Sequence, residues 1–194
     1  MLNRKIAPYK IILASGSPRR QQFFRDLGLD FEIRLREIEE VFPPELKAAE
    51  ITDYLARLKA DAFDDLPHGE ILVTSDTLVW HNGQALGKPK DYDDAVAILR
   101  SLSGATHQVF TSVCFKTSAK TETISDVTKV TFNPLTDGEI AYYLDACKPY
   151  DKAGAYGIQD WIGLVGVRKI EGSYANVMGM PVDKVYAYLN NFKP

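Results

Sequence analysis

The stretch Ile11-Ile12-Leu13-Ala14-Ser15-Gly16-Ser17-Pro18-Arg19-Arg20 decides how the rest of the chain is read. Its leading apolar residues predict a buried strand, and Ser-Gly-Ser predicts a tight turn. Ser17 is a favourable N-cap and proline a favourable first helical residue, so a helix should begin here. Arg19 and Arg20 then add cations where the helix dipole is already positive. Free amides, the Ser15 and Ser17 hydroxyls and two guanidinium groups favour a phosphate site. The plain alternative is a strand–turn–helix junction with two solvated arginines.

The composition is that of a globular protein. A chain of 194 residues is long enough for one large domain, 1–194, or two closely joined lobes. The formal net charge of −3 argues against a general nucleic-acid binder, which would normally show a basic stripe. Cys114 and Cys147 make neither a disulfide framework nor a metal-binding spacing. No apolar run has the length of a signal peptide or a membrane span, which predicts a cytoplasmic protein without a membrane partner.

Helices and strands are predicted to mix without a strict strand–helix–strand repeat. Gly28 should end the first helix, because glycine is the usual residue just beyond a helix C-terminus. His81-Asn82-Gly83-Gln84 between two apolar runs predicts a hairpin. Further predicted segments are a strand at 29–36, a helix containing Lys59, a strand at 71–74, helices opened by Asp91 and by Thr136 with Glu139, a strand at 164–170 and a last helix from Pro181. This order predicts the α/β class, with a mixed twisted sheet and flanking helices.

Asp76 is a candidate catalytic residue. It stands in Ser75-Asp76-Thr77, between two apolar runs, and aspartate is disfavoured in strand interiors. A functional reason for it is a hard oxygen ligand for Mg²⁺ or a base that activates water. The alternative is a turn residue that is hydrogen-bonded to nearby amides.

Lys88 and Glu40 are the next candidates. Pro89 favours an extended Lys88, whose ammonium would neutralise charge on a transferring phosphoryl group if it lay close to Asp76. Glu40 ends an acidic run and would join Asp76 as a ligand, since a metal held on a triphosphate takes one or two carboxylates. The alternatives are a solvated loop lysine and a solvated acidic surface.

Small residues dominate the loop Lys152–Gln159. They serve turn geometry, close helix packing or backbone approach to a ligand. The Gln159 amide carries both donors and an acceptor, so it would complement the imide edge of uracil or thymine. The three histidines show no ligand spacing, which argues against a zinc site.

Several motifs, in order over nearly the whole chain, closely resemble the Maf family of nucleoside triphosphate pyrophosphatases. These motifs are Leu13–Arg20, Ser75–Thr77, Gly87–Lys90, Leu102–Val109, Asp151–Gln159, Ile170–Tyr174 and Gly179–Pro181. The resemblance implies an elongated α/β fold of the Maf and inosine-triphosphatase kind, with a cleft between two lobes, often as a homodimer. It also implies hydrolysis of a nucleoside triphosphate between the α and β phosphates, with a divalent metal cation, Mg²⁺ or in its place Mn²⁺ or Co²⁺.

The resemblance assigns residues as well. Asp76 would be the general base or a metal ligand, with Glu40 as the second ligand. Phosphate and substrate contacts would come from Ser15, Ser17, Arg19, Arg20, Lys59, Thr77 and Lys152. Lys88 and Gln159 match further catalytic positions of the family's active site. Ser75 stands where the family usually has alanine, and it would add a hydrogen bond beside Asp76.

The form of the Lys152–Gln159 loop resembles the subgroup that acts on dTTP and UTP. Two other functions stay open. One is the same reaction on 7-methyl-GTP or a non-standard purine nucleotide. The other is a nucleotide-binding regulator of cell division, because the family's older name concerns septum formation. The charged residues favour an enzyme, since a pure binder needs no metal together with a water-activating carboxylate.

Overall fold

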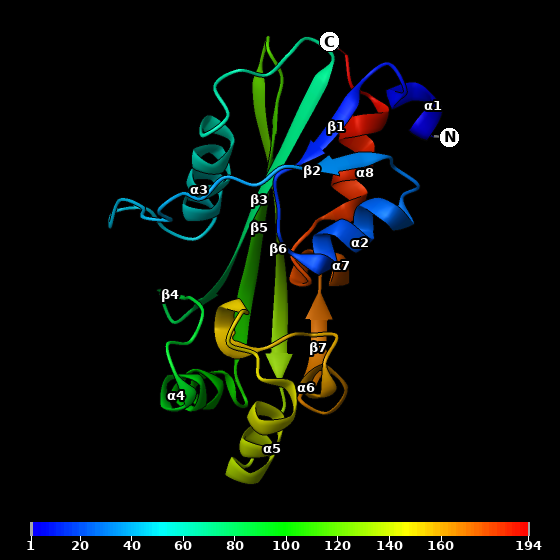
Figure 1. The fold of residues 1–194 in the computed structure, drawn as a ribbon. Helices are drawn as coiled ribbons and strands as arrows, with labels where there is room; N and C mark the ends of the chain where they lie inside the picture. The colour runs from blue at the N-terminus through cyan, green and yellow to red at the C-terminus, as the bar shows by residue number, and fades with distance from the viewer. Residues whose placement is uncertain (1, 194) are drawn as a thin grey trace. The chain divides into compact units, whose positions relative to one another are not determined.

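The computed structural model describes residues 2–193, apart from the side chain of Asn3. Its helices are α1 (Leu2–Ile6), α2 (Pro18–Asp26), α3 (Ala49–Asp61), α4 (Tyr92–Leu102), α5 (Asp137–Cys147), the 3₁₀ turn η1 (Ala153–Ala155), α6 (Trp161–Val165), α7 (Tyr174–Val177) and α8 (Val182–Asn190). Its strands are β1 (Lys10–Leu13), β2 (Phe31–Ile33), β3 (Glu70–His81), β4 (Gln84–Leu86), β5 (Thr106–Lys116), β6 (Thr121–Phe132) and β7 (Val167–Glu171). They form one mixed sheet in the order β2-β1-β3-β5-β6-β7, with β4 beside β3, which confirms the predicted fold class (Figure 1).

The chain separates into two compact units, and β3, β5 and β6 contribute residues to both. The first unit comprises the residues up to Asp76, Thr111–Asp126 and the residues from Gly179 on. The second comprises Thr77–Phe110 and Val127–Met178. A single domain spanning residues 1–194 stays a prediction.

In the first unit, β1 pairs in parallel with β2 and β3, and helices cover both faces of the sheet. Strand residues alternate between the faces. Ile11 and Leu13 therefore join one core with α1, α2 and α8, whereas Ile12 joins a smaller core under α3. Figure 1 shows α3 on one side of the strands and α1, α2 and α8 on the other. Burial on both faces explains why β1 reads as a continuous apolar run.

Local signals predicted several boundaries correctly. Gly28 follows α2 with a φ of +67°, a left-handed conformation in which glycine carries no steric penalty. Asn82 and Gly83 both have positive φ and turn β3 into β4. The Asp91 carboxylate accepts a hydrogen bond from the Asp94 amide at the start of α4. Thr136 and Glu139 form a complete capping box at the start of α5.

The strand predicted at 29–36 is shorter than expected. Only Phe31–Ile33 forms β2, because its partner β1 ends at Leu13, which pairs with Ile33. Beyond that point the chain has no neighbouring strand, and the side chain of Leu35 is exposed. The acidic run with Glu40 lies in the irregular segment that follows.

The strand predicted at 71–74 is longer than expected. β3 runs from Glu70 to His81, so Asp76 and Thr77 lie inside a strand and not at its end. β1 pairs with its first part and β4 with its last part. Backbone pairing with neighbouring strands along most of β3 outweighs the low strand propensity of aspartate.

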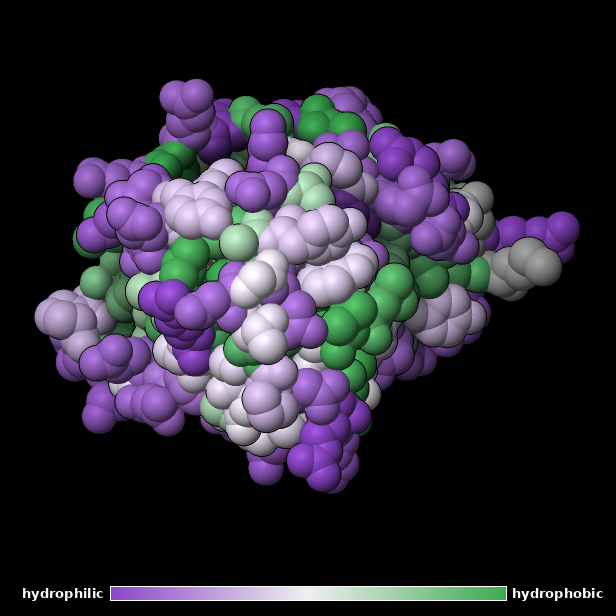
Figure 2. Space-filling view, turned by 90° about the horizontal axis from the view of Figure 1, so that it is seen from below, coloured by the Kyte–Doolittle hydropathy of each residue, from purple (hydrophilic) through white to green (hydrophobic). Residues whose placement is uncertain are grey.

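The second unit has its own core, built from the far ends of the long strands and from α4, α5 and α6. The strand predicted at 164–170 is wrong in its first half: Leu164 and Val165 belong to α6, and β7 begins at Val167. A Cβ on Gly163 would lie only 1.7 Å from the Ile158 carbonyl oxygen, so this glycine allows the helical turn to pack closely. On this unit Tyr142, Leu164 and Val165 stay exposed. In Figure 2, which looks onto the α5 and α6 end of the ribbon view, apolar and pale aromatic side chains lie among hydrophilic ones.

Candidate active site

The predicted site residues are divided between the two units. The first unit holds Ser15, Ser17, Arg19, Arg20, Glu40, Lys59 and Asp76, and the second holds Thr77, Lys88, Lys152 and Gln159.

An ion-paired triad joins three predicted residues of the first unit. The Lys59 ammonium lies 2.7 Å from Asp76 Oδ1 and 3.1 Å from Glu40 Oε1. Asp76 is buried in β3, Lys59 comes from α3 and Glu40 from the irregular segment after β2. Strand and helix periodicity explain the contact, since Leu72 of β3 packs under α3 and Asp76, four residues on, faces the same way.

Arg20 connects α2 to the strand that carries Asp76. Its Nε donates to the Gly179 carbonyl at 2.9 Å and its Nη1 donates to the Ser75 carbonyl at 3.0 Å. Burial lowers the pKa of the Arg20 guanidinium, Asp76 and Glu40 raise it, and Arg19 lowers it. These four charges are therefore close enough to interact. The anchoring of Ser75 and Gly179 by Arg20 was not predicted from the sequence.

Ser15 and Ser17 flank the turn into α2. Ser17 occupies the N-cap position, but its side chain makes no capping hydrogen bond, contrary to the expectation from residue type. The Ser17 amide instead donates to Ser15 Oγ at 3.3 Å. The Ser75 hydroxyl lies 3.5 Å from the Gly179 carbonyl oxygen, at the long limit of a hydrogen bond.

The donor set of the first unit fits a divalent cation that is held mainly by a substrate. Asp76 and Glu40 converge on one ammonium and supply the carboxylate oxygens that Mg²⁺ prefers. Residues 2–193 contain no cluster of three or more histidine, cysteine, aspartate or glutamate side chains that would hold a metal alone. Mg²⁺ commonly binds through one or two carboxylates plus phosphates and water, so two carboxylates are sufficient.

In the second unit Lys152 and Gln159 lie at the two ends of one loop that begins with η1. Lys152 Nζ is 2.8 Å from Asp151 Oδ1 and 3.9 Å from Asp160 Oδ2, and Gln159 is exposed. The Gly154 amide donates to the Gly87 carbonyl at 3.0 Å, which joins this loop to the segment carrying the exposed Lys88. Thr77 is half-buried in β3.

Two buried polar side chains support this loop, and residue-type reasoning missed both. The Tyr143 hydroxyl accepts from the Gly157 amide at 2.9 Å, and His107 Nε2 lies 2.7 Å from the Tyr156 hydroxyl. The available signal was general: a tyrosine hydroxyl buried on an apolar helix face needs a hydrogen-bond partner.

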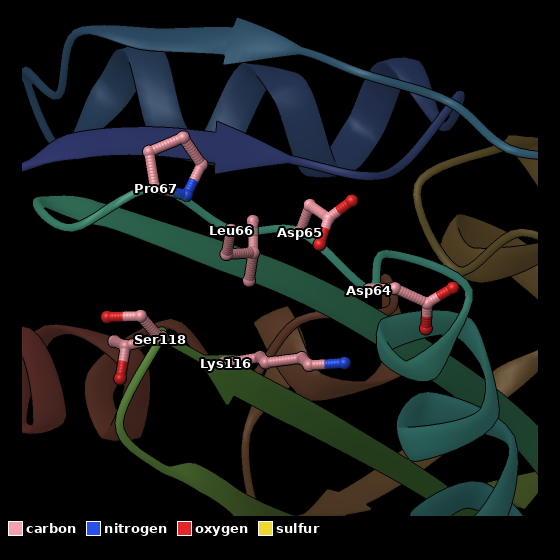
Figure 3. Close-up of a pocket in the computed structure, with 7 residues that line it drawn as sticks. Asp64, Asp65, Leu66, Pro67, Lys116 and Ser118 are labelled. Atoms are coloured by element: carbon pink, nitrogen blue, oxygen red, sulfur yellow. The ribbon is translucent and has the colours of Figure 1, made fainter.

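A separate surface pocket of about 380 Å³ lies at the C-terminal end of α3. Figure 3 shows Leu66 and Pro67 on the segment before β3, with Lys116 and Ser118 on the opposite side. The Lys116 ammonium lies 3.2 Å from the Ala60 carbonyl and 3.5 Å from Asp61 Oδ1. No predicted site residue lines this pocket.

Solved structures share the α/β fold of this chain. The described structure is similar to the Ham1 protein of Staphylococcus aureus, with a TM-score of 0.53 over 93% of this chain and 97% of that one. It is also similar to a HAM1 protein from Coxiella burnetii, with a TM-score of 0.51 over 95% of this chain and 100% of that one. The sequence identities are 12% and 13%, so these likenesses show a shared α/β fold and no more.

The chain belongs to the Maf family, because the family model described as Maf-like protein matches residues 10–192. Among curated relatives, a dTTP/UTP pyrophosphatase of Flavobacterium psychrophilum is 66% identical over 98% of both chains. A protein of the same name from Flavobacterium johnsoniae is 63% identical over 97% of this chain and 98% of its own. The resemblance drawn from the motifs is thereby confirmed.

Within residues 2–193, every helix is too short or too polar to cross a membrane.

Proposed function

We propose that this protein hydrolyses dTTP and UTP to the corresponding monophosphate and pyrophosphate. The observation that carries the proposal is the Asp76–Lys59–Glu40 triad next to the basic start of α2, found in a member of the Maf family. Relatives that share 66% and 63% of its residues carry the name dTTP/UTP pyrophosphatase. The conclusion for this chain combines those names with the local geometry.

The triad orients water, and the basic groups hold the phosphates. Asp76 orients the water that attacks the α-phosphorus. A new bond forms between the water oxygen and the α-phosphorus as the bond to the α,β-bridging oxygen breaks, pyrophosphate leaves, and the proton lost by the water passes to solvent. Phosphoryl transfer needs positioning and charge stabilisation more than covalent help from the protein. The phosphate oxygens bind the amides and hydroxyls at the start of α2. Positive charge is supplied by Arg19, Arg20 and Lys59 of the first unit.

Asp76 and Glu40 would hold a divalent cation together with the triphosphate. When bound, that cation neutralises charge on the phosphate oxygens. Lys59 holds the two carboxylates near one another before substrate arrives. This explains why an ammonium lies between two residues that are proposed as metal ligands.

Gln159 reads the base. Its amide presents an acceptor oxygen and an NH₂ donor, which complement the N3–H and O4 groups of uracil and thymine. Exposure of Gln159 leaves this amide accessible to a ligand.

Pyrophosphate release from dTTP, UTP, CTP, GTP and 7-methyl-GTP at equal concentrations tests the proposal. The assay is run with Mg²⁺, with Mn²⁺ or Co²⁺, and with a chelator. We expect metal-dependent release that is fastest with dTTP and UTP and absent with the chelator. Release led by a purine nucleotide would overturn the assignment of Gln159 but keep the reaction. No release from any nucleotide would favour a nucleotide-binding regulator of cell division.

A homodimer, a cytoplasmic location and the lack of nucleic-acid binding stay predictions. Light scattering coupled to size-exclusion chromatography measures the mass directly, against 21.7 kDa for one chain.

A further inference from the structure

The Tyr143 hydroxyl holds the loop that carries Gln159. Tyr143 is fully buried on α5, with Ile140 and Leu144 in the same core. Its hydroxyl accepts a hydrogen bond from the Gly157 amide at 2.9 Å and donates one to Asp160 Oδ2 at 3.1 Å. Burial raises the pKa of the Tyr143 phenol, so the hydroxyl keeps the proton that it donates.

These two hydrogen bonds lie on either side of Gln159 in the sequence. Gly157 comes two residues before Gln159, and Asp160 comes one residue after it. One buried hydroxyl therefore fixes the chain before and after the amide side chain. Asp160 Oδ2 also lies 3.9 Å from Lys152 Nζ. The Tyr143 hydroxyl is therefore connected through Asp160 to the side chain at the other end of the loop.

This part of the loop is closely packed. A Cβ on Gly157 would lie 2.5 Å from Asp160 Oδ2 and 2.9 Å from Gln159 Nε2, so a larger residue there would displace both side chains. The Gln159 amide thus lies against the Gly157 backbone. Tyr156 gives a further fixed point through its 2.7 Å hydrogen bond with His107 Nε2.

A fixed loop matters because a glutamine amide alone does not choose between pyrimidines. Thymine and uracil present an acceptor at position 4, whereas cytosine presents an amino donor there. A glutamine side chain that is free to rotate by half a turn satisfies either pattern, since its oxygen and nitrogen exchange places. Discrimination requires that the amide be held in one orientation.

We propose that Tyr143 is a specificity-determining positioning residue: its hydroxyl fixes Gly157 and Asp160 so that the Gln159 amide accepts thymine and uracil and rejects cytosine. This inference rests on the proposed function, in which Gln159 reads the base. Tyr143 itself touches no substrate in this scheme, because it is buried in the core.

The test compares Tyr143→Phe with Tyr142→Phe. The first change removes only the hydroxyl of a buried ring, and the second makes the same change on the adjacent residue, whose ring is exposed and packs against Trp161. For Tyr143→Phe we expect the KM for dTTP and UTP to rise about tenfold, as expected when a buried N–H and a carboxylate both lose a partner. The kcat should change less than about threefold, and the preference for dTTP over CTP should fall about tenfold. Tyr142→Phe should match the wild type.

Gln159→Ala, measured in parallel, separates two kinds of failure. If Gln159→Ala loses the preference for dTTP over CTP while Tyr143→Phe keeps it, the role of Tyr143 is overturned and the proposed function stands. If the wild type releases pyrophosphate from no pyrimidine nucleotide, the proposed function fails first. If Tyr143→Phe does not fold, Asp160→Ala removes the other end of the same hydrogen bond at a half-buried residue. An unchanged preference in Asp160→Ala would then overturn the proposal.

Discussion

At the scale of single residues, Lys59 is the centre of the first unit's charged group. Its ammonium pairs with a mostly buried carboxylate, Asp76, and with a largely solvated one, Glu40, whose side chain is 48% exposed. The exposed pair contributes little to stability because water screens it. The pair with Asp76 matters more, since a carboxylate inside a strand without its cation would be poorly compensated.

The first prediction concerns Asp76→Asn. The amide keeps the size of the side chain but loses the charge that orients water, so nucleotide binding should persist while turnover falls by at least about 100-fold. Pyrophosphate release gives turnover, and calorimetric titration with dTTP in the presence of Mg²⁺ gives binding. Asp65→Asn, an exposed carboxylate of the same unit, is the matched control and should behave as the wild type. Hydrolysis by Asp76→Asn at the wild-type rate would show that the catalytic assignment is wrong.

At the scale of helices and strands, a row of buried hydroxyls fixes α3 on the sheet. The Thr74 hydroxyl of β3 donates to the Ala56 carbonyl of α3 at 2.6 Å. The Thr52 and Ser112 hydroxyls lie 2.7 Å apart, and Ser112 also donates to Asp53 at 2.6 Å. Thr74 shares a strand face with Asp76, and Ala56 lies one helical turn before Lys59. The Thr74 hydrogen bond therefore joins β3 to α3 close to both Asp76 and Lys59.

The second prediction compares Thr74→Val with Thr74→Ser. Valine loses the hydrogen bond and serine loses a methyl group, and each change should destabilise the protein by about 1 kcal/mol. Thermal unfolding should therefore show a Tm lowered by about 2–4 °C in both variants. Only Thr74→Val should also lose turnover, because only that variant releases α3 from β3. Equal turnover in the two variants would contradict the positioning role of this hydrogen bond.

At this scale the sequence predicted what depends on a few neighbouring residues. Gly28, the Asn82-Gly83 turn and the Thr136–Glu139 capping box each fix their own backbone, and all three were confirmed. Strand lengths depend on distant partners. β2 stops where β1 stops, and β3 continues past Thr74 because β4 pairs with its far end. Residue type alone gives neither length.

The same distinction applies to the candidate site. Motif resemblance singled out Asp76, Lys59 and Glu40, and the structure brings these three together. It did not indicate that Arg20 bonds to the carbonyls of Ser75 and Gly179, because backbone acceptors far along the chain leave no pattern in residue types. Nor did it indicate the hydrogen bonds of the Tyr143 hydroxyl, because the position of Tyr143 fits the apolar pattern of α5 in the sequence.

At the scale of the whole molecule, lowering the pH should first reduce the free energy of unfolding through a buried histidine in the core of the second unit. Burial, with a smaller effect of His81, lowers the pKa of His107 to about 3. A histidine in the unfolded chain has a pKa near 6.5. Between that pH and about 3, His107 is therefore protonated in the unfolded chain and neutral in the folded one. The stability that neutral His107 provides is complete above about pH 6.5 and is lost as pH falls toward 3.

The third prediction is a pH-dependent stability that His107→Gln abolishes. Between about pH 6.5 and pH 5 the unfolding free energy of the wild type should fall by roughly 1 kcal/mol per pH unit, with the slope approaching about 1.4 kcal/mol per unit at the acid end of this range. The pKa values of Glu32, Glu122 and Glu139 are lowered by hydrogen bonds, so those carboxylates affect stability only at lower pH. Urea unfolding at pH 7, 6 and 5 measures the slope, with the exposed His68→Gln as control. A slope that persists in His107→Gln would assign the effect to another group.

The early end of β2 has a consequence for how copies of the chain behave together. β2 is the last strand at one edge of the sheet. The unpaired backbone N–H and C=O groups of an edge strand can pair with a strand of another chain. Here the edge is three residues long and lies beside a charged cluster, with Lys10 Nζ 2.6 Å from Glu32 Oε2 and Arg34 Nη1 2.9 Å from Glu70 Oε2. Short, charged edges are poor templates for another chain. The brevity of β2 therefore disfavours strand addition at this edge of the sheet.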